Sequence, residues 1–184
     1  PDAYYATKFE QDTFHKSSNA GQNWETLTLG RPNVIYSLAA DPSHAELLYA
    51  GTEKGVLRSA DGGHSWSEAT TGLIASFVGN LAVSQQKPSK VWAAVEGEVL
   101  ASDDWGRHWR ATGEQATSIE IDPTNDSILY SRHWQGVGKS TDGGQSWIEA
   151  SGGLFDPEIG RVIIRAMAHH PRKSLRRGVR RLWR

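Results

Sequence analysis

The sequence of 184 residues contains no cysteine, one methionine and no apolar run as long as a membrane span. The lack of cysteine excludes disulfide bonds and cysteine-ligated metal sites. No glycine-rich loop stands between a strand and a helix, so no phosphate-binding motif is present, and we expect no cofactor. No signal peptide is visible, but the chain begins at Pro1 without methionine, so its location stays open at this stage.

Positive and negative charges nearly balance but are unevenly distributed. The chain has 20 Lys and Arg residues and 21 Asp and Glu residues, and seven of the basic residues lie in 171–184, which contains no acid. Subtraction leaves residues 1–170 with 13 basic and 21 acidic residues, a balance of −8. Such an acidic body disfavours a nucleic-acid groove.

One short motif dominates the rest of the sequence. The pattern S-x-[DN]-x-G-x-x-W occurs four times, and its starts are 42, 43 and 38 residues apart. Its fixed positions are Ser17, Asn19, Gly21 and Trp24; Ser59, Asp61, Gly63 and Trp66; Ser102, Asp104, Gly106 and Trp109; and Ser140, Asp142, Gly144 and Trp147. Four copies at nearly constant spacing indicate a repeated structural unit.

Each unit contains four short apolar or alternating segments bounded by Gly, Pro or Asp. In the second unit these segments are 34–40, 47–51, 55–59 and 66–69. Four strands in about 40 residues are typical of one propeller blade. We therefore predict an all-β fold, a β-propeller of four-stranded antiparallel blades, over residues 1–170. The predicted blades are about 1–30, 31–72, 73–113 and 114–153, with a partial blade from 160.

The repeat resembles the Asp-box (BNR) propellers, a superfamily that includes sialidases, sortilin-type receptor domains, photosystem II assembly-factor propellers and xyloglucan-cleaving glycosidases. The segment 41–66, DPSHAELLYAGTEKGVLRSADGGHSW, is most similar to the last three groups. The resemblance covers nearly the whole chain, and it implies the fold more strongly than the function. It also favours an extracellular or periplasmic location. Sialidase catalysis in the superfamily uses an Arg-Ile-Pro segment, which this sequence lacks.

The aspartates of the motif invite a catalytic interpretation, but a structural one is favoured. Asp61, Asp104 and Asp142 recur once per unit at the same turn, where Ser and Asp side chains bond backbone N–H groups. The following glycine permits a positive φ. The tryptophan is expected to bury its ring between strands.

The two ends of the repeat leave alternatives open. The first unit lacks its first strand, whereas 162–168 has the pattern of a first strand. Either this segment closes a four-bladed ring on the first unit, or the chain is a fragment of a larger propeller, which we favour. Open strand edges would then invite self-association. The basic segment 171–184 has three interpretations: an anion-binding patch, a solvated end or a degraded blade. The last is favoured, because the segment still follows the blade pattern.

Loop length varies most in the connections between successive blades, so we expect functional residues there and in the connections between second and third strands, which lie on the same face of a propeller. The ligand-face candidates are Glu53, Glu96, Arg132, His133, Trp134, Phe155, Asp156, Glu158 and Arg161. Carboxylates near an aromatic platform suit sugar binding or hydrolysis. No metal site is expected, because His169 and His170 on a strand would point to opposite faces.

Three functions are consistent with these observations. The favoured one is a non-catalytic module that binds a protein or peptide through its loops. The second is part of an extracellular xyloglucanase-like glycoside hydrolase that acts on a carbohydrate. In the enzymes of that group the sugar cleft lies between two propellers, and only part of one is present here. The third is a truncated propeller without independent function.

Overall fold

A computed structural model describes residues 3–7, 12–41, 44, 46–73, 77–134 and 136–152. Every regular element in these ranges is a β-strand. In this part of the chain there is no helix with the length and apolar character needed to cross a bilayer.

The strands form one three-stranded sheet and three four-stranded sheets, all antiparallel, with neighbours in chain order. The first sheet holds β1 (Tyr4–Thr7), β2 (Thr13–Ser17) and β3 (Glu25–Thr28). The second holds β4 (Ile35–Ala40), β5 (Leu48–Thr52), β6 (Gly55–Ser59) and β7 (Ser67–Glu68). The third holds β8 (Val78–Val83), β9 (Val91–Val95), β10 (Glu98–Ser102) and β11 (Arg110–Gln115). The fourth holds β12 (Ser118–Ile121), β13 (Leu129–His133), β14 (Gly136–Ser140) and β15 (Ile148–Glu149).

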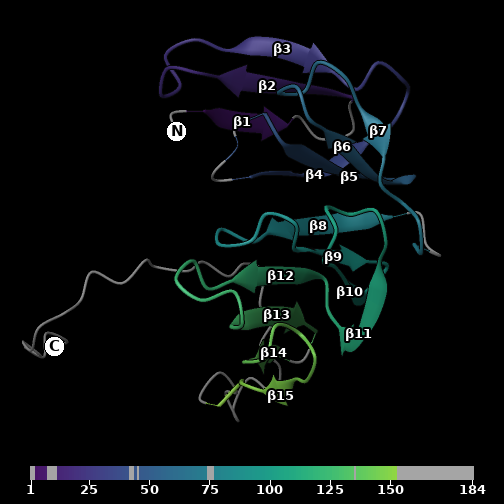
Figure 1. The fold of residues 1–184 in the computed structure, drawn as a ribbon, viewed down its shortest axis with the longest axis vertical. Helices are drawn as coiled ribbons and strands as arrows, with labels where there is room; N and C mark the ends of the chain where they lie inside the picture. Colours follow the sequence, from purple (N-terminus) through teal and green to yellow (C-terminus); the bar gives the residue numbers. More distant parts are fainter. Residues whose placement is uncertain are drawn as a thin grey trace, which may run out of the picture.

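The four sheets follow one another in chain order, with the first and fourth at opposite ends of the row (Figure 1). The first strands of neighbouring four-stranded sheets adjoin, β4 beside β8 and β8 beside β12. In the first sheet β1 takes the position of a second strand, because Tyr4 pairs with Ser17 as Leu48 pairs with Ser59. Among the described residues, the first sheet therefore has no strand in the position of a first strand.

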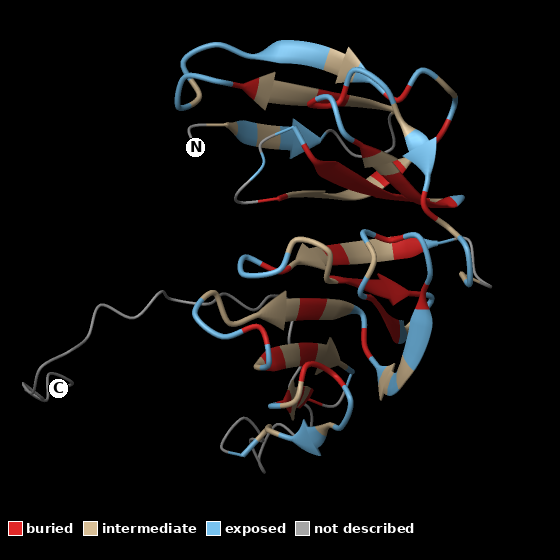
Figure 2. Cartoon of the chain, in the orientation of Figure 1, coloured by how far each residue is buried: buried red, intermediate tan, exposed pale blue. Residues whose placement is uncertain are grey.

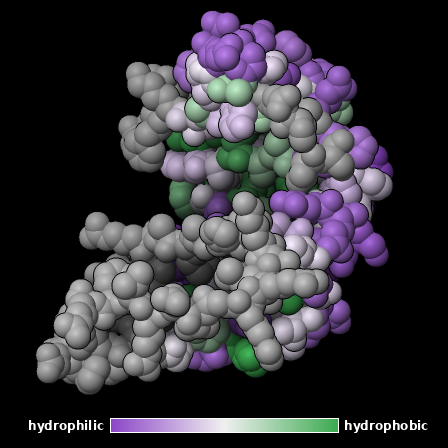
Figure 3. Space-filling view, turned by 90° about the vertical axis from the view of Figure 1, so that its left-hand side faces the viewer, coloured by the Kyte–Doolittle hydropathy of each residue, from purple (hydrophilic) through white to green (hydrophobic). Residues whose placement is uncertain are grey.

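The apolar cores lie between successive sheets. Strands β5 and β9 are buried along their whole length, whereas β3, β7, β11 and β15 are mostly exposed at the outer edge (Figure 2). A strand covered on both faces carries a nearly continuous apolar sequence, as in LYAGT and VWAAV. In the space-filling view, apolar side chains gather towards the middle of the visible face and polar ones along its upper and right-hand rim (Figure 3).

The repeated motif forms the turn between the third and fourth strands, which we call the box turn. In the second sheet the Ser59 hydroxyl donates to Asp61 (2.7 Å) and accepts from the Gly63 N–H (2.8 Å), while the Asp61 carboxylate accepts from the Ser65 N–H (2.9 Å). The turns beginning at Ser17, Ser102 and Ser140 contain the same three hydrogen bonds. Each carboxylate or amide therefore holds its own turn together.

The four box tryptophans do not share one environment. Trp109 is buried, and its indole N–H donates to the Ala69 carbonyl of the preceding sheet at 2.8 Å. Trp66 is half-buried and meets Phe14 of the first sheet edge-on, with ring centroids 5.7 Å apart. Trp24 is 46% exposed, so the expectation of a buried ring is wrong there. The reason is that no described sheet precedes the first one to cover it.

The box turns predict a loss of stability in acid. The Ser65 hydroxyl lowers the pKa of Asp61 below its ordinary value of 3.8, and the Ser146 hydroxyl does the same for Asp142. The His108 side chain lowers the pKa of Asp104 to about 2. A lowered folded-state pKa stabilises the fold above the unfolded value, and this stabilisation is lost as the pH falls towards the folded value. We therefore expect the free energy of unfolding to decline below about pH 4.

Urea titrations between neutral pH and pH 2.5 would measure this decline. The matched variant is Asp61→Asn with Asp142→Asn, because Asn19 already occupies this position in the first box turn with the same hydrogen bonds. Its stability should depend less steeply on pH than that of the wild type. Equal slopes for the two proteins would contradict the assignment.

Candidate functional site

The two ends of the sheets carry different connections. In the three four-stranded sheets, the box turn is hydrogen-bonded to the connection between first and second strands of its own sheet, as in Gly62 N–H to the Glu46 carbonyl at 2.8 Å. At the other end, Ala116 N–H donates to the Gly97 carbonyl at 2.8 Å, and Thr117 N–H donates to the Arg132 carbonyl at 2.8 Å. The connections between second and third strands and between sheets therefore share one end, which we call the loop face.

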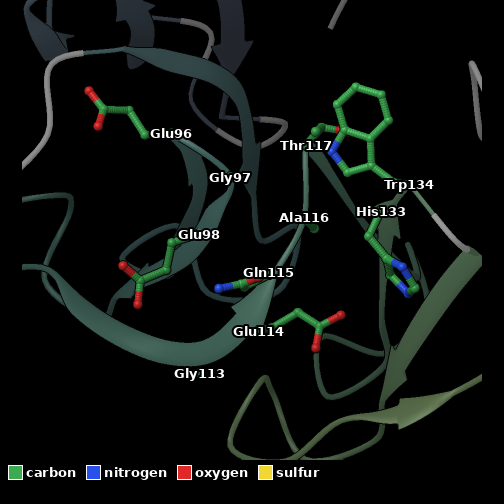
Figure 4. A pocket seen from close by; sticks show the side chains of 10 residues that line it. All are labelled: Glu96, Gly97, Glu98, Gly113, Glu114, Gln115, Ala116, Thr117, His133 and Trp134. Carbon is green, nitrogen blue, oxygen red and sulfur yellow. The ribbon is translucent and has the colours of Figure 1, made fainter.

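A groove of about 1110 Å³ opens on the loop face between the third and fourth sheets (Figure 4). It is lined by Glu96, Gly97, Glu98, Gly113, Glu114, Gln115, Ala116, Thr117, His133 and Trp134. We call it the Trp134 groove. Glu96 and Glu98 lie on one side of it, Trp134 and His133 on the other, and Gln115 and Glu114 between them (Figure 4).

One wall of the groove is a two-residue hairpin. Val95 pairs with Glu98, so Glu96 and Gly97 alone make the turn, with φ values of 49° and 89°. Two successive positive φ values are those of a type I′ turn, whose twist matches that of the strands. Glutamate is an unusual residue in the left-handed region, and such strained positions cluster at functional sites.

The opposite wall carries the aromatic platform. Trp134 is 86% exposed, so both ring faces are open to a ligand to an extent rare for tryptophan. It follows His133 at the end of β13, and the His133 Nε2 lies 3.5 Å from a Glu149 carboxylate oxygen. The imidazole is thus linked to the fourth strand of its own sheet beside the platform.

The floor comes from a bulged strand. Glu98 of β10 pairs with Gln115 of β11, and Leu100 pairs with Ala111. Three residues of β11, 112–114, therefore lie opposite the single residue of β10 between these pairs. A bulge bends a strand and re-aims its side chains. Glu114 accepts a hydrogen bond from the buried Ser131 hydroxyl of the next sheet, which fixes one of its carboxylate oxygens.

The structure brings together three of the nine ligand-face candidates, Glu96, His133 and Trp134. Arg132 directly precedes His133 in β13 but does not line the groove. Glu53 lies in a separate groove of about 550 Å³ between the first and second sheets. Phe155, Asp156, Glu158 and Arg161 lie outside the described residues, as do His169 and His170.

Four polar groove residues were missed by the sequence interpretation: Glu98, Glu114, Gln115 and Thr117. The first three lie in strands, at the start of β10 and the end of β11, and not in the loops where functional residues were expected; Thr117 lies in the connection between the third and fourth sheets. Within the described ranges, no group of His, Cys, Asp and Glu side chains is arranged to hold a metal ion. Open carboxylates, a carboxamide and one exposed indole suit a ligand rich in hydroxyl groups with an apolar face.

Comparison with known proteins shows which sequences and structures the chain is similar to. Over 172 residues the chain is 26% identical to a xyloglucanase of Hypocrea jecorina (strain QM6a), with 73% of this chain and 20% of that protein covered. An ancestral GH74 enzyme has a TM-score of 0.63 at 20% identity, covering 81% of this chain and 24% of its own. The GH74 xyloglucanase from Xanthomonas campestris has a TM-score of 0.65 at 18% identity, covering 82% and 29%. No protein-family model matches the chain.

These similarities bear on the choice among the three expected functions. The sequence favoured a non-catalytic binding module, whereas the relatives support the alternative of a xyloglucanase-like glycoside hydrolase. The chain spans about a fifth to three tenths of the length of these relatives. The predicted all-β propeller fold is confirmed by the sheets and by the solved relatives. The chain is a β-propeller chain, similar over most of its length to part of the GH74 xyloglucanases.

Proposed function

We propose that the chain is part of a glycoside hydrolase of the xyloglucanase type and that the Trp134 groove binds the polysaccharide. The observation that carries the proposal is the pairing of the 86%-exposed Trp134 with carboxylates across one groove on the loop face. An indole can cover the apolar face of a sugar ring, while Glu98, Glu114 and Gln115 offer hydrogen bonds to its hydroxyls.

The relatives supply the substrate class. The curated relative is a xyloglucanase, and one solved structure is a GH74 xyloglucanase. Glycoside hydrolysis by two carboxyl groups requires an acid and a second carboxylate on either side of the bond. Glu96 and Glu98 on one wall and Glu114 on the floor are the carboxylates that line the groove, and we propose that the two roles fall among them.

Two further assignments belong to the same proposal. The four box turns, with their shared hydrogen bonds, support membership of the Asp-box superfamily. A polymer of plant cell walls is degraded outside the cell, so an extracellular location accompanies a xyloglucan substrate. Binding of a protein or peptide has no support comparable to the sugar-type groove.

The test is binding of soluble xyloglucan to the full chain, measured by isothermal titration calorimetry beside the variant Trp134→Ala. We expect the variant to bind at least about tenfold more weakly, because a central exposed aromatic carries much of the affinity of such a site. Trp105→Ala is the matched control. Trp105 is 42% exposed and belongs to a box turn, so its loss removes an indole from the opposite end of the sheets.

The proposal is contradicted if the wild-type chain does not bind xyloglucan, or if it binds dextran equally well. Equal losses for Trp134→Ala and Trp105→Ala would place the binding outside the groove. Reducing-sugar release from xyloglucan by the same chain is to be measured in parallel. If the chain itself hydrolyses the polymer, Glu98→Gln and Glu114→Gln should reduce the rate without weakening binding to the same degree.

A further inference from the structure

The fourth sheet departs from the repeat at one buried cross-strand pair. In the second and third sheets, two positions in from the pair made by the box-turn serine, a buried alanine pairs with a buried leucine: Ala50 with Leu57 and Ala93 with Leu100. Both of these pairs belong to apolar core clusters. The fourth sheet has Ser131 paired with Gly138 at this position, and both residues are buried. It therefore lacks the leucine side chain and has a buried hydroxyl instead.

The carboxylate of Glu114, from the preceding sheet, occupies the room beside this pair. A Cβ placed on Gly138 would overlap both Glu114 Oε1 and the Ser131 hydroxyl, and it would lie 3.3 Å from Glu114 Cδ. The Ser131 hydroxyl donates a hydrogen bond to the same Glu114 Oε1. The serine thus supplies a donor for the carboxylate, and the glycine supplies the space.

The bulge in β11 fixes the backbone that carries this carboxylate. The Thr112 hydroxyl donates to the Val99 carbonyl at 2.8 Å and accepts from the Glu114 N–H at 3.3 Å. Strand β11 also adjoins β13, which carries Ser131. Glu114 is therefore held at its backbone by its own sheet and at its carboxylate by the next sheet.

Holding a carboxylate in this way is not required by the fold. An apolar pair fills the equivalent position in the second and third sheets, and moving part of a carboxylate out of water costs free energy. Departures from an otherwise consistent pattern are expected at functional sites. Glu114 also lines the Trp134 groove, where it lies between Glu98 and His133 (Figure 4).

We infer that Ser131 and Gly138 are positioning residues of the Trp134 groove. They hold Oε1 of Glu114, and the second carboxylate oxygen accepts a hydrogen bond from a hydroxyl group of the bound polysaccharide. A group fixed before the ligand arrives loses less conformational entropy on binding, which strengthens the contact. The assignment rests on the proposed function, and it identifies Glu114 as the groove carboxylate whose position is set in advance.

The test is binding of soluble xyloglucan to the full chain, measured by isothermal titration calorimetry for two substitutions that disturb the carboxylate differently. Ser131→Ala removes the donor, and Gly138→Ala fills the space that the carboxylate occupies. We expect each to weaken binding about tenfold, the loss that follows from misplacing one hydrogen bond to a charged group. Circular dichroism melts verify that the variants are folded, and either substitution carries the test if the other does not fold.

Two further variants separate positioning from general damage to the junction. In a Glu114→Ala background, which itself binds about tenfold more weakly, neither substitution should weaken binding further, because both act through Glu114. Ser84→Ala is the matched control. The buried Ser84 hydroxyl of the third sheet donates to the Asp126 carboxylate of the fourth, across the same junction but at the end away from the loop face. This variant should bind like the wild type.

The possible results distinguish the inference from the proposed function. If the wild type binds xyloglucan and Ser131→Ala or Glu114→Ala binds equally well, the inference is overturned and the proposed function stands. Losses that persist in the Glu114→Ala background, or an equal loss for Ser84→Ala, overturn the inference too, because the effect would not pass through Glu114. A wild type that does not bind xyloglucan overturns the proposed function, and the role of Glu114 as a sugar contact falls with it.

Discussion

Trp92→Ala is expected to lower the free energy of unfolding by about 3–5 kcal/mol, the cost of removing a large buried aromatic. Trp92 is 2% exposed and is among the largest buried side chains. It joins Val99 of its own sheet to Ile119 and Leu129 of the next in one apolar cluster. The cavity would therefore open at the junction of the third and fourth sheets, beside Gly144 of the last box turn.

Trp92→Phe is the informative companion. The Trp92 indole N–H is buried and has no acceptor among the described residues, so phenylalanine removes an unsatisfied donor as well as ring area. We expect it to cost about 1–2 kcal/mol, well below the cost of alanine. Urea titration at neutral pH measures both. A cost for alanine of less than about 1 kcal/mol would show that the two sheets do not pack through this ring.

Gly63→Ala is expected to cost about 3 kcal/mol or more, since backbone strain and overpacking act together. Gly63 has a φ of +96°, and a Cβ there would lie 2.5 Å from the Phe14 ring and 3.3 Å from Leu48. Phe14 is fully buried and cannot move into solvent. The first and second sheets would have to separate to admit the methyl group.

Gly30→Ala provides the matched control. Gly30 has a φ of +71°, but a Cβ there would have no atom within 4 Å among the described residues. It should therefore cost only the conformational strain, about 1–2 kcal/mol. The difference between the two alanine variants measures the sheet-to-sheet contact. Equal costs, from equilibrium unfolding in urea, would mean that Phe14 does not pack against the box turn.

The strands could be read from the sequence because each repeat marks its own boundaries. The segment 55–59 was expected to the residue, since a glycine opens the strand Gly55–Ser59 and the serine of the box turn closes it. No local sequence pattern indicates that Trp24 is exposed. All four tryptophans have the same local motif, and the presence or absence of a preceding sheet decides how much water each one meets.

The residues of the Trp134 groove also divide into those predicted from the sequence and those that were not. Glu96, His133 and Trp134 were expected on the loop face, because loop length varies at that end of the repeat. Glu114 and Gln115 were not expected, because they reach the groove through a register shift between β10 and β11. A register shift depends on which residues of two strands pair, and local sequence does not encode that pairing.

The sequence by itself determined the repeating unit, its four strands and the turn that closes it, since turn chemistry and side-chain alternation act over a few residues. Only the tertiary structure decided which carboxylates share a groove with Trp134, and how far the ring of each box tryptophan is buried. Those properties arise between sheets. Burial and proximity there depend on the neighbouring sheet as much as on the residue itself.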